Sequence, residues 1–173
     1  DRLLASVVAS RDLAFWVKAL AGLAPVLTLD IARHRPLVMK MRSAVHRFLI
    51  PQVLVERTVA FARGHDVTLF TTLLTAFKVL LSRHAGVTDI AVGTTVANRQ
   101  QPEVEQMVGV FVNNVVLRTD LAGAQDFDGL VQRVRRTVED AFAHQSLPFL
   151  EVVQALRPER TLSHTPLFQV LFV

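Results

Sequence analysis

Apolar residues repeat with the period of an α-helix in several stretches of the chain. One face near the start carries, at positions i, i+3, i+4 and i+7, Leu13, Trp16, Val17 and Leu20. A helix is predicted over residues 51–63, from Pro51 to the glycine that follows, and another over the apolar run 68–84, which Gly86 closes. A long amphipathic helix is predicted over residues 127–142. Asp66 is predicted to cap the helix over 68–84. A short fifth helix is predicted to begin at Pro148.

Other stretches have the pattern of strands. Apolar and small residues alternate over residues 90–96, and a second β-rich run covers residues 110–121. Residues 44–50 are predicted as a strand, and the continuous apolar run 167–173 as a buried strand. Helices and strands interleave without an internal repeat. This order predicts one α/β or α+β domain, with a sheet flanked by helices.

Composition narrows the class of protein. The chain has 173 residues, 51% of them hydrophobic, which is enough for a buried core. It contains no cysteine. Disulfides, thiol nucleophiles and cysteine metal sites are therefore excluded, and a cytoplasmic location is expected. The sequence begins without methionine and ends in the run 167–173, so we expect it to be part of a longer protein.

Charge and hydropathy argue against nucleic-acid and membrane partners. Nineteen basic and fifteen acidic residues give a net charge of +4. The densest basic cluster, Arg133, Arg135 and Arg136, shares a predicted helix with apolar residues on the opposite face, without the interleaved aromatic residues that nucleic-acid binding favours. The most apolar stretch, residues 67–81, is interrupted by threonines and a lysine and is shorter than the roughly 20 residues of a membrane span.

The sequence contains none of the usual self-contained catalytic motifs. Its six histidines, at positions 34, 46, 65, 84, 144 and 164, are far apart, and no HExxH pair occurs. A GxSxG nucleophile motif, a phosphate-binding GxxxxGK[ST] loop and a GxGxxG loop are also missing from the sequence. We therefore predict no metal site and no bound cofactor.

Three polar residues stand in apolar surroundings. Strand alternation places Asn113 on the same face as Phe111 and Val115, where its amide needs hydrogen-bond partners. The amide either holds a neighbouring loop or lines a substrate cavity. Asn98 and Arg99 follow a predicted strand, either as a turn-forming residue and a solvated cation or as part of a site.

Five segments, taken in order, resemble the C-terminal part of nonribosomal peptide synthetase condensation domains. They are RDLAFWVKAL, VTLFTTLLTAFKVLLSRHAGVTDIAVGTTVANR, MVGVFVNNVVLR, HQSLPFLEVVQAL and RTLSHTPLFQVLFV. The third is similar to the family pattern I-G-x-F-V-N-T, the fourth to H-x-x-x-P-F-x-x-L-V and the fifth to R-x-x-S-x-x-P-L-F-Q-V. The resemblance extends over nearly the whole chain.

The resemblance implies a chloramphenicol-acetyltransferase-like lobe with a central mixed sheet flanked by helices. Two such lobes form a tunnel, in which the acceptor amine attacks the donor thioester on phosphopantetheine arms of two carrier proteins. The family's H-H-x-x-x-D-G motif, which orients or deprotonates the amine, does not occur here. Residues 1–173 are therefore predicted to be the C-terminal lobe, incomplete without the N-terminal lobe and inactive alone, with an adenylation domain as a neighbour.

The resemblance also assigns residues. Gly109, Phe111 and Asn113 are predicted near the tunnel, and Asn98 and Arg99 in its floor segment. The positions that match the last two family motifs are His144, Pro148, Phe149, Ser163, Pro166, Phe168 and Gln169. Two alternatives stay open: a non-catalytic module that docks carrier proteins, and the lobe of a related heterocyclisation or epimerisation domain, although the GVFVNN segment favours condensation over epimerisation.

Overall fold

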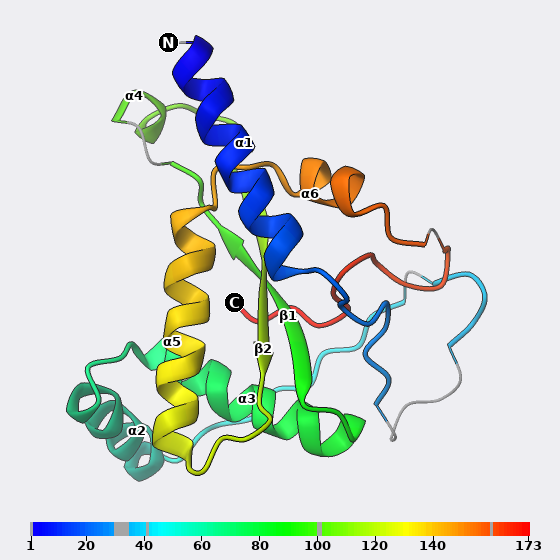
Figure 1. Cartoon of the computed structure of the whole chain (residues 1–173). Coiled ribbons are helices and arrows are strands. Elements are labelled where there is room, and N and C mark those ends of the chain that lie inside the picture. Colours follow the sequence, from blue (N-terminus) through cyan, green and yellow to red (C-terminus); the bar gives the residue numbers. More distant parts are fainter. Residues whose placement is uncertain (1, 30–34, 41, 100–101, 160) are drawn as a thin grey trace.

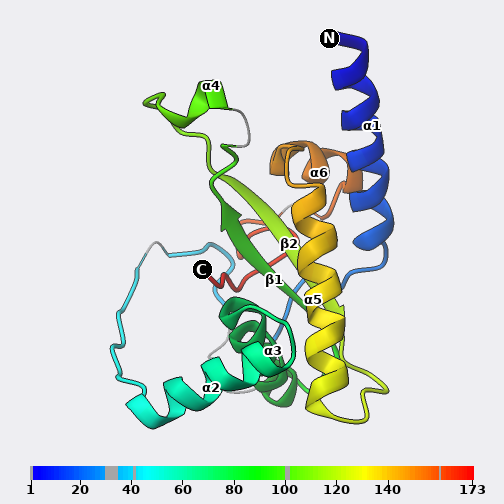
Figure 2. The ribbon, with the colours of Figure 1, turned by 90° about the vertical axis from the view of Figure 1, so that its left-hand side faces the viewer.

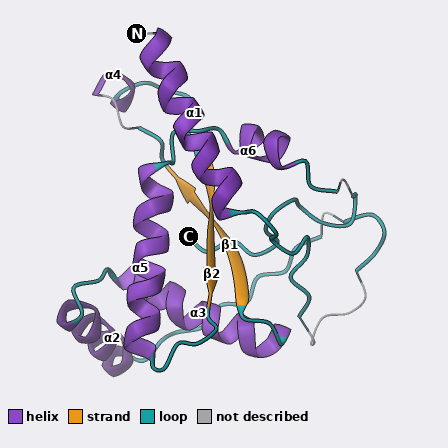
Figure 3. Ribbon diagram, in the orientation of Figure 1, coloured by secondary structure: helices purple, strands orange, loops and turns teal. Residues whose placement is uncertain are grey.

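The computed structural model describes residues 2–29, 35–40, 42–99, 102–159 and 161–173. Its elements, in chain order, are α1 (Arg2–Ala19), α2 (Gln52–Gly64), α3 (Leu69–Ala85), β1 (Asp89–Val96), α4 (Pro102–Glu105), β2 (Asn113–Asp120), α5 (Phe127–Ala143) and α6 (Phe149–Leu156). The two strands lie at the centre of the molecule (Figures 1 and 3). The mixture of helices and sheet agrees with the predicted fold class.

The strands β1 and β2 pair antiparallel, from Asp89 opposite Asp120 to Val96 opposite Asn113. The chain end adds a short parallel pairing to β1. The backbone N–H of Gly93 donates to the Val170 carbonyl at 2.9 Å, and the Phe172 N–H donates to the Gly93 carbonyl at 2.9 Å. The described sheet is therefore mixed: β1 and β2 pair antiparallel, and a single bridge joins β1 to the chain end in parallel.

Helices enclose the sheet at both of its ends. Figures 1 and 2 show α1 and α6 together at one end, α2 and α3 at the other, and α5 running alongside β2 between them. Alternate residues of the strands and the inner faces of α3 and α5 form the core, whose most deeply buried apolar side chains are Leu74, Ile90, Val92, Val115, Leu117, Val131 and Val134. These are the positions that the helical and strand periodicities predict to face inward.

Two of the strand predictions are wrong. Residues 44–50 form no strand, and Leu49 is 96% exposed. A strand needs a neighbour for its backbone groups, and the described residues offer these seven none. The run 167–173 pairs only around Leu171, and Val173 is 82% exposed, so it is not a buried strand.

Two further boundaries differ from the predictions. The strand predicted over residues 110–121 begins only at Asn113, because β1 ends at Val96, the partner of Asn113, and so offers residues 110–112 no strand to pair with. The cap of α3 is Thr68 rather than Asp66: the Thr68 hydroxyl accepts a hydrogen bond from the Thr71 N–H at 3.1 Å. Asp66 instead adopts a left-handed conformation, with a φ of 51°, in the turn between α2 and α3.

Candidate functional site

Asn113 stands at the first position of β2 and holds the connection between α5 and α6. Its Nδ2 donates to the carbonyls of Gln145 at 2.8 Å and Leu147 at 2.7 Å. Its Oδ1 accepts from the N–H of Phe149 at 3.0 Å. These are the contacts of an amide that holds a neighbouring loop, one of the two interpretations that the sequence leaves open.

The same connection is held from its other side by α1. The Nδ1 atom of His144 lies 2.7 Å from the buried carboxylate of Asp12, and the imidazole stacks on Phe15 at a centroid distance of 4.0 Å. The indole N–H of Trp16 donates to the His144 carbonyl at 3.0 Å. His144 is therefore a packed residue between α1 and the end of α5.

Arg99 organises the loop between β1 and β2. Its guanidinium donates to the carbonyls of Val104, Glu105, Met107 and Gly109, and it lies over the ring of Phe111 at 4.4 Å. Arginine suits this place because its planar fork presents several donors and also stacks on aromatic faces. Arg99 is thus bound within its own loop while its side chain stays half-exposed.

The loop that Arg99 holds carries two of the predicted tunnel residues. Phe111 lies outside β2, so the strand alternation that placed it on the face of Asn113 does not reach it. Gly109 lies close to this ring, since an added Cβ would come within 3.1 Å of it. Asn98 has a φ of 50°, the left-handed conformation expected of a turn-forming asparagine.

The C-terminal motif packs along β1. The ring of Phe168 covers Gly93 so closely that a Cβ there would lie 2.3 Å from it, so a larger residue at position 93 would displace the ring. Phe168 also contacts the ring of Phe149, at 5.5 Å. The side chain of Gln169 accepts from the Leu27 N–H at 2.8 Å and donates to the Pro25 carbonyl at 3.2 Å.

The remaining motif positions lie around α6. Pro148 is the residue before its first turn, and its side chain makes no capping hydrogen bond. Pro166 lines a groove of about 900 Å³ between α6 and residues 157–159 and 161–166. The Ser163 hydroxyl makes a local contact, 2.9 Å from the hydroxyl of Thr161. The structure thus gathers Asn113, His144 and the last two motifs into one junction, separate from the loop of Arg99.

Two buried or paired cations were not singled out from the sequence. Lys78 has no exposed surface, and its Nζ donates to the Leu117 carbonyl and the Thr119 hydroxyl, both at 2.7 Å. Burial lowers the pKa of Lys78 to about 7, although the charge of Asp89 opposes this effect. The signal for it was a lysine inside the most apolar helical stretch.

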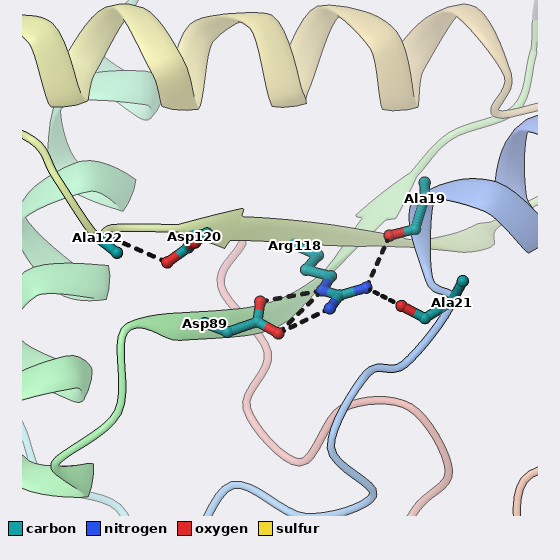
Figure 4. Close-up of polar contacts among 6 residues, drawn as sticks. All are labelled: Ala19, Ala21, Asp89, Arg118, Asp120 and Ala122. Atoms are coloured by element: carbon teal, nitrogen blue, oxygen red, sulfur yellow. Dashed lines mark hydrogen bonds and ion pairs between the residues drawn. The ribbon is translucent and has the colours of Figure 1, made fainter.

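The second cation, Arg118, joins three elements. It donates from Nε and Nη2 to the carboxylate of Asp89 at 2.8–3.1 Å, and from Nη1 to the carbonyls of Ala19 and Ala21 (Figure 4). The hydrogen bonds and charge of Asp89 raise the pKa of Arg118 above its ordinary value. Its position in an alternating strand gave no hint of these partners, which lie far away in the sequence.

The described residues contain no group of three histidine, aspartate or glutamate side chains arranged to hold a metal ion. None of the described helices is both long and apolar enough to cross a membrane. The described side chains of the family-like motifs instead form hydrogen bonds and ring contacts that join distant elements of the chain.

Comparison with known proteins identifies the family. The condensation-domain profile matches residues 2–173. The chain belongs to the condensation-domain family. It is 43% identical over 165 residues to a linear gramicidin synthase of Brevibacillus parabrevis, covering 95% of the chain and 2% of that protein. It is 40% identical over 161 residues to phosphinothricin tripeptide synthetase PhsC of Streptomyces viridochromogenes, covering 93% of the chain and 15% of that protein.

Solved structures show the same condensation-domain fold. A four-domain nonribosomal peptide synthetase bound to AMP and glycine superposes with a TM-score of 0.90 at 28% identity, over 92% of this chain and 12% of that one. The X-domain from teicoplanin biosynthesis superposes with a TM-score of 0.88 at 26% identity, over 94% of this chain and 36% of that one. The chain therefore spans a small part of its synthetase relatives and about a third of the X-domain.

Proposed function

We propose that this chain is the C-terminal lobe of a condensation domain that forms an amide bond between a donor acyl or peptidyl thioester and an acceptor aminoacyl thioester. The observation that carries the proposal is the family match over residues 2–173, together with relatives that are peptide synthetases. This chain covers about a third of the X-domain, as expected if it is one lobe of a larger unit. The N-terminal lobe is its first partner.

The chemistry we propose divides between the two lobes. The H-H-x-x-x-D-G motif that the family uses on the acceptor amine does not occur in residues 1–173, so we assign proton transfer to the other lobe. The thioesters arrive on phosphopantetheine, which the donor and acceptor carrier proteins supply and this chain does not bind by itself. An adenylation domain is the expected neighbour, in keeping with the four-domain synthetase that was solved with AMP and glycine.

Within this chain, we propose that the loop of Arg99 and Asn98 forms part of the tunnel floor, with Gly109 and Phe111 near the tunnel. The support is that a single guanidinium binds several carbonyls and one ring of this loop, contacts that restrain its conformation. A preorganised loop can present its backbone and apolar side chains to a substrate without a further ordering cost.

The test is an assay of amide formation between two loaded carrier proteins. The chain alone should give no product above background. The same chain joined to its natural upstream sequence should give product, and a variant in which the second histidine of the upstream motif is replaced by alanine should lose roughly 10²–10⁴-fold in rate. Turnover by residues 1–173 alone would contradict this division of the chemistry.

A carrier-docking module without chemistry is the second candidate. It is favoured by the likeness to the X-domain, with a TM-score of 0.88 and 27% identity to this chain. That X-domain was solved in a complex with another protein, OxyB, so a domain of this fold can bind a protein partner. The natural upstream sequence separates the two candidates, because a complete H-H-x-x-x-D-G motif there supports the enzyme. Its absence, with carrier binding retained, supports the docking module.

A further inference from the structure

The helix α6 begins without a cap of its own. Its first residue, Phe149, follows Pro148, whose side chain makes no capping hydrogen bond. The first N–H groups of any helix have no partner within the helix and must find one elsewhere. With eight residues, α6 also has little internal cooperativity to hold it in place. Its position therefore depends on contacts from outside the helix.

Asn113 supplies that missing cap from a distant strand. Its Oδ1 accepts the N–H of Phe149, and its two amide hydrogens go to the carbonyls of Gln145 and Leu147, so the whole side-chain amide is engaged by one loop. Each bond joins positions more than thirty residues apart. An amide whose two donor hydrogens are both used by protein carbonyls has no N–H left for a substrate.

The cap is also the start of a continuous path of contacts. Phe149, which it fixes, packs against Phe168 at 5.5 Å, and Phe168 lies directly on Gly93 of β1. Beside that contact, the chain end pairs with β1 through Val170 and Phe172. Asn113 is thereby connected to residues 168–172, which lie along the edge of β1 opposite β2.

We infer that Asn113 is a positioning residue of the condensation reaction: it caps α6 from β2 and so fixes the connection 144–148 and the seat of residues 167–172 on β1. The inference rests on the proposed function for the reaction it serves. It assigns to the asparagine of the family-like motif a task carried out through the protein, and it excludes direct contact of its N–H groups with substrate.

The sharpest variant is Asn113→Asp in the intact synthetase, because it changes the donors and keeps the shape. An ionised carboxylate would face the two carbonyls that Nδ2 now binds, whereas a protonated one regains a donor. The substrate-free variant should exchange backbone hydrogens in residues 145–156 roughly 10-fold faster than the natural protein, compared at equal pH near 8. This excess should shrink as the pH falls towards 5.

Activity supplies the second measurement, at a temperature well below unfolding. For Asn113→Asp we expect kcat about 10-fold lower near pH 8, with KM for both loaded carriers unchanged and with recovery towards the natural kcat on acidification. The matched control is Gln132→Glu, which makes the same change from amide to carboxylate on α5, where the natural side chain donates to the His65 carbonyl at 3.0 Å, away from α6. At every pH, its exchange rates in residues 145–156 and its kcat should keep a constant ratio to those of the natural protein.

Three outcomes would overturn the inference. They are natural exchange rates in residues 145–156 of Asn113→Asp, faster exchange with unchanged kcat, and a defect confined to KM. The last would indicate that the amide touches substrate. If the natural synthetase forms no amide at all, the proposed function fails, while faster exchange in Asn113→Asp would still establish the cap.

Discussion

At the scale of single residues, Lys78 is an ionisable side chain that lies fully buried in the core. It lies on α3 with no exposed surface, and its two hydrogen bonds go to Leu117 and Thr119 of β2. Thr119 in turn donates to the hydroxyl of Thr137 on α5 at 3.2 Å. A buried ammonium is costly unless it is bonded, so this small polar cluster joins three elements of the core at the expense of desolvating a charge.

The burial of Lys78 predicts a pH-dependent stability. The folded state lowers its pKa to about 7, below its value of about 10.4 in the unfolded chain, so between these values the unfolded state binds more protons. The contribution of Lys78 to the free energy of unfolding should therefore rise with pH from about 7 upward, by at most about 1.4 kcal/mol per pH unit, and fall to a constant minimum below pH 7.

Chemical unfolding of the parent domain between pH 6 and 9 measures this effect. Subtracting the free energy of unfolding of Lys78→Met from that of the natural domain should give a difference that increases with pH. Lys18→Met removes an exposed lysine of α1 and serves as the control, with a difference that stays flat. Parallel curves for the natural domain and Lys78→Met would show that the buried amine does not titrate in this range.

At the scale of elements, Arg118 decides how α1 meets the sheet. Its guanidinium binds Asp89 on the neighbouring strand and the carbonyls of Ala19 and Ala21 at the end of α1 (Figure 4). Helix ends leave carbonyls without partners, and a cation there also favours the helix dipole. One side chain thus performs the capping that the sequence of α1 does not supply locally.

Replacing Arg118 with lysine should loosen this junction although the charge is kept. A lysine lacks the planar fork and cannot bind the carboxylate at two points and two carbonyls together. We expect a loss of about 1–2 kcal/mol in the free energy of unfolding, with faster hydrogen exchange in residues 19–23. Arg136→Lys, on the exposed face of α5, should leave both quantities unchanged. An unchanged free energy of unfolding and unchanged exchange in Arg118→Lys would show that the planar fork of Arg118 is not needed to join α1 to the sheet.

At the scale of the whole molecule, two segments present apolar side chains to solvent. In residues 45–50 and 107–112 the exposed ones are Val45, Phe48, Leu49, Ile50, Met107, Val108, Val110 and Val112. Val108 and Val110 are almost fully exposed, at 104% and 96%. Side chains of this kind, clustered along the sequence rather than scattered, are typical of surfaces that meet a partner.

We therefore expect the chain alone to self-associate, and the proposed N-terminal lobe, added in trans, to reduce the association. Sedimentation velocity over a range of concentrations, with a dye that binds apolar surface, measures both. The double variant Val108→Ser with Val110→Ser should associate less, since it removes apolar area without touching the core. A monomer at high concentration that binds no dye would contradict the half-domain interpretation and favour a self-sufficient docking module.

The sequence predicted best where structure depends on near neighbours. The helix α5 and the strand β1 follow from periodicity, and α2 and α6 from the prolines that precede them, because each of these signals lies within a few positions of the element. It predicted poorly where pairing was needed: residues 44–50 have strand composition and no strand, and the chain end forms one bridge. Composition does not say whether a neighbouring strand is present.

The order of helices and strands was enough to predict the fold class, and the ordered motifs were enough to identify the family. Both depend on residues that lie close together in the sequence. The partners of the polar side chains were decided only in three dimensions. Asn113 reaches the loop before α6, Lys78 reaches β2 and Arg118 reaches α1. The physical reason is that a buried polar group must satisfy its hydrogen bonds wherever the fold brings a partner, and here the partners lie 32 to 99 residues away in sequence.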